Sequence, residues 1–135
     1  MIFLDANVLL RVLTNDDPEK AQQCFDLLRK AERGEVQLAT SEHVIAEVVY
    51  VLSSPRLYHL PAKRIRDLLL PILGLRGLKL PSRQVYRRAL DIYALHNADF
   101  GDTLTVAHMR KWEVRTILSY DRHFDRIEGV ERQEP

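Results

Sequence analysis

Short apolar runs alternate along this chain with longer segments whose apolar residues recur at helical spacing. The first run, residues 2–4, ends at Asp5, and the segment that starts at Val8 has helical character as far as Leu13. Parallel strands need crossover connections that place helices on the faces of the sheet. The alternation therefore predicts an α/β fold with a mainly parallel sheet covered on both faces, in the order β-α-β-α-α-β-α-α-β and then a short polar tail.

The expected elements follow from apolar spacing, capping residues and breakers. Strands are expected at residues 2–4, 36–40, 78–80 and 116–120. Helices are expected at residues 8–13, 18–33, 42–52, 60–73, 83–93 and 99–112. Pro71 is expected to kink or shorten the helix that contains it, because proline lacks a backbone N–H.

The size and composition predict one soluble domain over residues 1–135. With 135 residues and 46% hydrophobic content, the chain is long enough to bury one continuous core. Cys24 is the only cysteine, so no internal disulfide is available and a reducing cytoplasm is the expected compartment. The apolar start reaches Asp5 too soon for a signal segment or a membrane span. The net charge of +1 means that any nucleic-acid binding must come from local patches.

Four carboxylates scattered along the chain are the candidate chemistry. Asp5 and Asp121 each directly follow an apolar strand, and ligands of α/β sheets bind at the carboxyl ends of strands. Glu47 lies in the second turn after the second strand, and Asp102 lies in the first turn of its helix. All four can therefore project toward the same end of the sheet.

Each of these acids also has a purely structural explanation. Asp5 could cap the helix that follows it, and Asp102 could serve only as a partner of a helix dipole. Asp121 could be a turn former. Glu47 is expected to be mostly buried among apolar neighbours, where its structural alternative is a buried ion pair with an arginine.

Several carboxylates crowded at one pocket would repel one another unless a divalent cation compensated them. Ligation by oxygen alone favours Mg²⁺, with Mn²⁺ as a substitute. Such a site suits phosphodiester hydrolysis, because the metal polarises the phosphate and lowers the pKa of an attacking water. Zinc is disfavoured, because the histidines show no ligand spacing and are expected to be surface or packing residues; they are His43, His59, His96, His108 and His123.

Four short motifs in order resemble those of PIN-domain nucleases. The opening "LDANVLL" resembles the strand that ends in a metal-binding Asp, here Asp5, with Asn7 as its polar partner. "SEHVIAEVVYVL" resembles the family helix with a single Glu, here Glu47. "DFGDTL" places the principal ligand at Asp102 and an auxiliary acid at Asp99. "SYDRHF" is similar to the closing motif, in which Ser119 hydrogen-bonds within the acidic site beside Asp121.

The resemblance covers essentially the whole chain and is greatest to the VapC-type toxins of toxin–antitoxin pairs. It implies a single-domain α/β/α sandwich with a mainly parallel five-stranded sheet and a divalent-metal-dependent endoribonuclease activity. It also implies RNA as substrate, a homodimer, and a cognate antitoxin that inserts a peptide into the acidic groove. The number of strands, the RNA substrate, the homodimer and the antitoxin do not follow from composition or periodicity.

Two other classes of function remain to be weighed against a nuclease. A phosphatase or a receiver domain also places an Asp after the first strand. The phosphatase would require a second Asp at the position of Asn7. The receiver domain would require a Lys after the last strand, at the position of Asp121, and the chemistry of neither class involves an acid such as Glu47. A binding-only module would be favoured if an acid were missing, and all four are present. Cleavage of DNA stays open, because the acids do not sense the 2′-hydroxyl.

Overall fold

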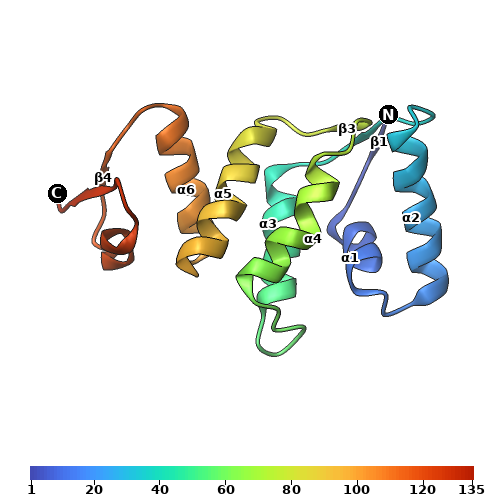
Figure 1. The fold of residues 1–135 in the computed structure, drawn as a ribbon, viewed down its shortest axis with the longest axis horizontal. Helices are drawn as coiled ribbons and strands as arrows, with labels where there is room; N and C mark the ends of the chain where they lie inside the picture. The colour runs from blue at the N-terminus through green and yellow to red at the C-terminus, as the bar shows by residue number, and fades with distance from the viewer. The chain divides into compact units, whose positions relative to one another are not determined.

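The computed structural model describes all 135 residues, in which six α-helices alternate with five short strands (Figure 1). The elements in chain order are β1 Ile2–Phe3, α1 Ala6–Thr14, α2 Pro18–Glu32, β2 Leu38–Ala39, α3 Glu42–Ser53, α4 Ala62–Leu73, β3 Leu78–Lys79, α5 Arg83–His96, α6 Phe100–Lys111, β4 Thr116–Leu118, the 3₁₀ helix η1 Arg122–Arg126 and β5 Glu131–Gln133. Contacts within the chain divide it into two units, Met1–Arg83 and Gln84–Pro135, and each is described by itself.

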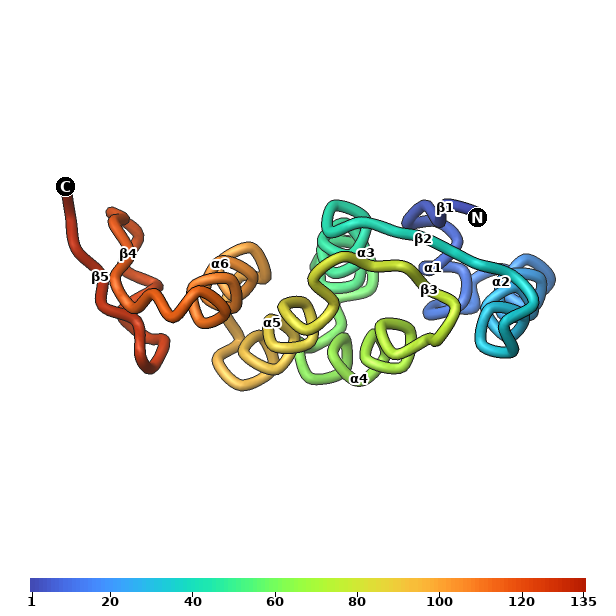
Figure 2. The backbone as a smooth tube through the Cα atoms, turned by 90° about the horizontal axis from the view of Figure 1, so that it is seen from above, coloured from blue at the N-terminus to red at the C-terminus, as the bar shows by residue number.

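The first unit is built on a three-stranded parallel sheet in the order β1-β2-β3, which Figure 2 shows from above. Ile2 pairs with Leu38, and Leu38 pairs with Leu78. A buried side-chain bond joins the carboxyl ends of β1 and β2, because Thr40 Oγ1 donates to the carbonyl of Leu4 over 3.2 Å. The residues that follow β1 and β2 are thereby fixed at one edge of the sheet.

Helices α1 to α4 supply most of the core of this unit. Each turns one apolar face inward, as the amphipathic spacing predicts. Among its fully buried side chains are Leu9, Leu38, Ile45, Leu52, Ile65, Leu69 and Leu73. Pro71 does not shorten α4, because the helix reaches Leu73 with the proline in its last turn; a kink at Pro71 stays a prediction. The proline removes one backbone N–H bond from this turn.

The second unit carries α5, α6 and the parallel pair β4–β5. Tyr93 of α5 and Phe100 of α6 are both buried, with ring centroids 5.7 Å apart in an edge-to-face arrangement. β5 lies in the segment that was expected to be a polar tail, and its Ile117–Arg132 register sets it beside β4. No apolar pattern in the sequence marks this strand, because its side chains are Glu, Arg and Gln.

The α/β class and the parallel strand pairing are confirmed. Five strands are present as the family resemblance implies, but they form a three-stranded and a two-stranded sheet rather than one sheet of five. A single domain over the whole chain stays a prediction. None of the helices has the length and apolar character needed to cross a bilayer.

Candidate metal centre

Asp5 is separated from the end of β1 by Leu4 alone, and it stands at the position that precedes the first turn of α1. Its backbone is extended, with φ −84° and ψ 162°, as in a helix cap, yet its side chain makes no capping hydrogen bond. The carboxylate instead accepts a hydrogen bond from Asn7, whose Nδ2 lies 3.4 Å from Asp5 Oδ2. The structure therefore brings Asp5 and Asn7 together and removes helix capping as the explanation of Asp5.

Glu47 lies on the exposed face of α3, so its expected burial was wrong. Ser41 caps this helix by accepting the N–H of Val44 over 3.3 Å. The buried face of α3 carries residues three and four positions apart, and Glu47 falls outside this stripe. Glu47 forms no ion pair, which also removes the buried Arg partner that was its structural alternative.

Asp102 lies in the first turn of α6, next to a second acid that caps the helix. Asp99 accepts the N–H of Asp102 at 3.3 Å and so fixes where the helix begins. Partial burial raises the pKa of Asp102, the charges of Asp99 and Asp121 raise it further, and His123 opposes the shift. Asp102 is therefore an acid whose ionised form lacks compensation in the protein alone, and a cation would supply that compensation.

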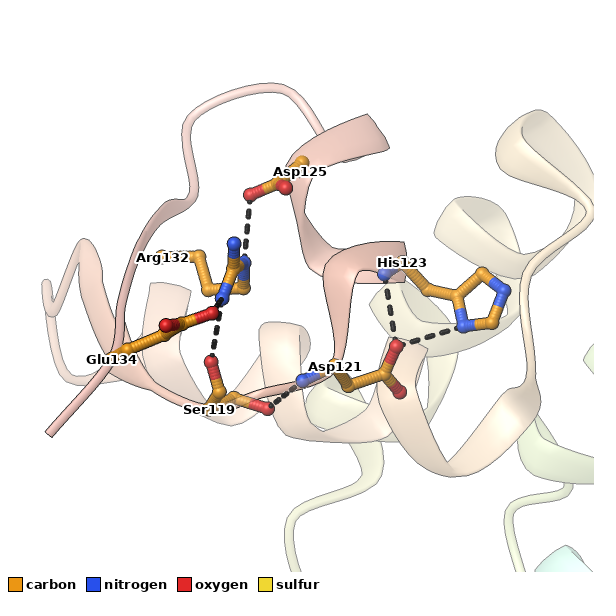
Figure 3. A network of polar contacts seen from close by, with 6 residues as sticks. All are labelled: Ser119, Asp121, His123, Asp125, Arg132 and Glu134. Carbon is orange, nitrogen blue, oxygen red and sulfur yellow. Dashed lines mark hydrogen bonds and ion pairs between the residues drawn. The ribbon is translucent and has the colours of Figure 1, made fainter.

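Asp121 follows β4 and is held by its neighbours in the chain (Figure 3). Its N–H donates to Ser119 Oγ over 3.0 Å, and its Oδ1 accepts the N–H of His123 over 2.9 Å. The same Oδ1 lies 2.8 Å from the ring Nδ1 of His123. These bonds, led by the backbone N–H, lower the pKa of Asp121. Asp121 therefore does serve as a local cap, as its structural alternative stated, but only one of its two oxygens is used.

Three side chains of the second unit form a group that could hold a metal ion. Asp102, Asp121 and His123 each offer one ligand atom, and these atoms lie within 4.8 Å of one another. Carboxylate oxygens suit Mg²⁺ and Mn²⁺, whereas an imidazole suits the later transition metals better. The residues present therefore fit a divalent cation.

His123 was not among the expected site residues. It was classed with the other histidines as a surface or packing residue, because no pair of histidines shows metal-ligand spacing. The signal that could have found it is its place two residues after Asp121, a distance over which a side chain reaches back to a carboxylate in a turn.

A pocket of about 220 Å³ adjoins this group in the second unit. Its charged and polar lining residues are His96, Asn97, Asp99, Asp102, His123 and Arg126. Acids that attract a cation thus share one hollow with side chains that donate to phosphate, as a phosphodiester substrate would require.

The expected site residues therefore fall into two groups that the structure describes separately. Asp5, Asn7 and Glu47 belong to the first unit, and Asp99, Asp102, Ser119 and Asp121 belong to the second. The joining of Asp5 and Glu47 with Asp102 and Asp121 in one centre stays a prediction.

Known proteins place the chain in a family. It is 27% identical over 129 residues to a VapC ribonuclease of Aquifex aeolicus (strain VF5). The matched region covers 94% of this chain and 92% of the relative. Among solved structures, it matches VapC20 of Mycobacterium tuberculosis, a Sarcin-Ricin loop cleaving toxin, with a TM-score of 0.39 and 16% identity over 97% of this chain and 98% of that one. The sequence model of the PIN domain matches residues 2–130, and so takes in all four candidate acids. The chain belongs to the PIN domain family.

Proposed function

We propose that this protein is a divalent-metal-dependent endoribonuclease of the VapC type, which hydrolyses phosphodiester bonds of RNA as the toxin of a type II toxin–antitoxin system. The observation that carries the proposal is the grouping of Asp102, Asp121 and His123 within 4.8 Å, in a chain that the PIN domain model matches over residues 2–130. The curated VapC ribonuclease that spans 94% of the chain supports RNA as the substrate class.

The metal would be held by Asp5, Glu47, Asp102 and Asp121, with Asn7, Ser119 and Asp99 in support. We propose Mg²⁺ as the ion and Mn²⁺ as its substitute, because the four principal donors are carboxylates. When bound, the ion would polarise the scissile phosphate and activate a water for attack. The chain itself contributes carboxylates that are not consumed by structural roles: Asp5 makes no cap bond, and Glu47 makes no ion pair.

The second unit supplies the groups that would bind and orient the substrate. Arg126 and His96 line the pocket of about 220 Å³ beside Asp102. Arginine binds phosphate oxygens through two parallel N–H bonds, which favours one orientation of the RNA sugar–phosphate backbone. Two further partners are part of the proposal: a cognate antitoxin and a second copy of the chain in a homodimer.

The proposal is tested by incubating the purified protein with a mixed pool of total RNA in Mg²⁺, in Mn²⁺ and in EDTA. An Asp5→Asn variant purified in the same way is the control for a contaminating nuclease. We expect fragments that depend on metal and are absent with the variant. Single-stranded DNA of the same sequence as a cleaved RNA tests whether the 2′-hydroxyl is required.

A binding-only module is the alternative that this experiment separates. It would give no cleavage under any condition and no heat of Mg²⁺ or Mn²⁺ binding by calorimetry. Retention of labelled RNA by such an inactive, metal-free protein would support that alternative instead.

A further inference from the structure

His123 contacts one oxygen of Asp121 twice. The backbone N–H of His123 donates to Asp121 Oδ1 over 2.9 Å, and the ring Nδ1 lies 2.8 Å from the same oxygen, as Figure 3 shows. An ionised carboxylate can only accept hydrogen bonds, so the ring must carry its proton on Nδ1. Oδ1 is thereby occupied by two donors, while Oδ2 of Asp121 accepts no bond from the protein.

The imidazole of His123 has no packing role that would explain this geometry. Its side chain is 67% exposed, whereas the nearby Phe124 is buried at 6% exposure and anchors η1. The backbone N–H of His123 alone would satisfy Asp121 as a cap of η1. The ring bond is therefore an addition to the local fold, and it restrains rotation of the carboxylate about its last torsion angle.

We infer that His123 is a positioning residue of the metal centre, which acts through Asp121. Its Nδ1–H holds Oδ1, so that Oδ2 is presented to the cation that Asp102 also serves. Hydrogen bonds from a second residue commonly fix a metal-binding carboxylate, and their loss lowers metal affinity. The inference rests on the proposed metal site, and it assigns to His123 a role that acts on the cation through a hydrogen bond and not through a bond to the metal.

The first test needs no metal. In protein with ¹⁵N-labelled histidine, at a pH well above the ordinary imidazole pKa, NMR distinguishes a ring protonated on Nδ1 from one protonated on Nε2. Free imidazole side chains in water favour the proton on Nε2. We expect His123 to carry it on Nδ1, and a proton on Nε2 would overturn the inference.

The second test compares two substitutions of His123 by the calorimetry of Mn²⁺ binding. In His123→Asn, the amide nitrogen takes nearly the place of ring Nδ1, whereas His123→Ala keeps only the backbone N–H. We expect Ala to weaken Mn²⁺ binding about tenfold, in the range found when support of a metal ligand is lost. We expect Asn to restore most of that affinity. His108→Ala, in the last turn of α6, is the matched loss of an imidazole and should bind Mn²⁺ like the wild type.

Electron paramagnetic resonance of bound Mn²⁺ provides the spectroscopic distinction. A directly coordinated imidazole gives a characteristic ¹⁴N modulation of the Mn²⁺ signal, and we expect none. That modulation in the wild type, if lost in His123→Asn, would overturn the positioning role in favour of direct ligation. Equal Mn²⁺ affinity in the wild type and His123→Ala would overturn it as well.

Failure of the inference is distinguishable from failure of the proposed function. If the wild type binds Mn²⁺ and cleaves RNA while His123→Ala does both equally well, only the role of His123 is refuted. If the wild type binds no Mn²⁺ at all, the metal site itself is refuted, and the role of His123 falls with it.

Discussion

Asn7 donates a hydrogen bond to Asp5 within the first turn after β1, with its Nδ2 3.4 Å from Asp5 Oδ2. This bond matters because Asp5 occupies the cap position of α1, yet its side chain accepts no hydrogen bond from the first N–H groups of that helix. Capping carboxylates normally turn inward to those groups. The backbone of Asp5 thus takes the place of a helix cap, while its carboxylate makes no bond to α1.

A pair of alanine substitutions separates these two kinds of aspartate. Asp17 caps α2 through a 3.2 Å bond from the N–H of Lys20, whereas Asp5 makes no such bond to α1. We expect Asp17→Ala to lower the free energy of unfolding by about 1 kcal/mol and to leave RNA cleavage intact. We expect Asp5→Ala to change the unfolding free energy by less than about 0.5 kcal/mol. It should lower the cleavage rate by at least about a hundredfold, as expected for loss of a metal ligand.

Urea unfolding in EDTA and cleavage of a defined RNA in Mg²⁺ measure the two effects. An Asp5→Ala protein that loses stability but still cleaves RNA would reverse the assignment and make Asp5 a structural residue.

Glu47→Gln tests the acid whose environment differed most from expectation. Because Glu47 is exposed and in no ion pair, its charge can be removed without leaving a buried partner unpaired. We expect weaker Mg²⁺ binding by calorimetry and an unchanged or slightly raised Tm in EDTA. The exposed Glu128→Gln is the charge-matched control and should alter neither quantity. A clear fall of the Tm of Glu47→Gln in EDTA would point to a structural role.

Local signals in the sequence predicted most of the helices. They also predicted where three of the candidate acids lie: Asp5 and Asp121 after strands, and Asp102 in the first turn of its helix. Capping residues marked the starts of α2 and α3, because Asp17 and Ser41 accept backbone N–H groups there. A carboxylate directly after an apolar strand likewise identified Asp5 and Asp121. These features are encoded within a few residues, so the sequence displays them directly.

The features that the sequence did not reveal depend on contacts between segments or on rotation of a helix. β5 is a polar strand that exists because it pairs with β4, and no apolar pattern marks it. The exposure of Glu47 depends on which face α3 turns toward the core, which its many valines and isoleucine obscure. His123 belongs to the site through one side-chain bond, which spacing rules for metal-binding histidines do not capture.

Arg132 is the residue of β5 through which the last strand supports Asp121. Its side chain is 13% exposed and binds Asp125 at 3.0 Å, Glu134 at 3.1 Å and the carbonyl of Ser119 at 2.9 Å (Figure 3). Ser119 in turn accepts the N–H of Asp121. Arg132→Met keeps an unbranched apolar stem but removes all three bonds.

We expect Arg132→Met to lower both the Tm in EDTA and the affinity for Mn²⁺, because the segment that carries Asp121 loses its side-chain attachment to β5 and keeps only the backbone bonds. Arg122→Met removes an exposed arginine that makes no ion pair, and it should leave the Tm unchanged. Equal Tm values for the two variants would show that Arg132 does not secure this segment.

Asp102 and Asp121 should respond to pH with opposite signs when no metal is present. The pKa of Asp102 is raised in the folded protein, first by burial and then by Asp99 and Asp121. Folding is therefore disfavoured by its ionisation, and this cost is present at neutral pH and disappears as the pH falls through the raised pKa. Asp102→Asn should have a higher Tm than the wild type in EDTA at neutral pH, with a difference that shrinks toward acid.

The pKa of Asp121 is lowered, first by the backbone N–H of His123, so its ionised form favours folding. That contribution is complete above the ordinary carboxyl pKa and is lost as the pH falls through the lowered value. Asp121→Asn should therefore have a lower Tm than the wild type at neutral pH in EDTA. Thermal unfolding from neutral to acid pH checks both variants at low ionic strength, where charge repulsion is least screened. Opposite shifts of the Tm would identify Asp102 as the acid that most needs a cation. Shifts in the same direction would show that the effects do not arise from a difference in how the protein stabilises the two ionised carboxylates.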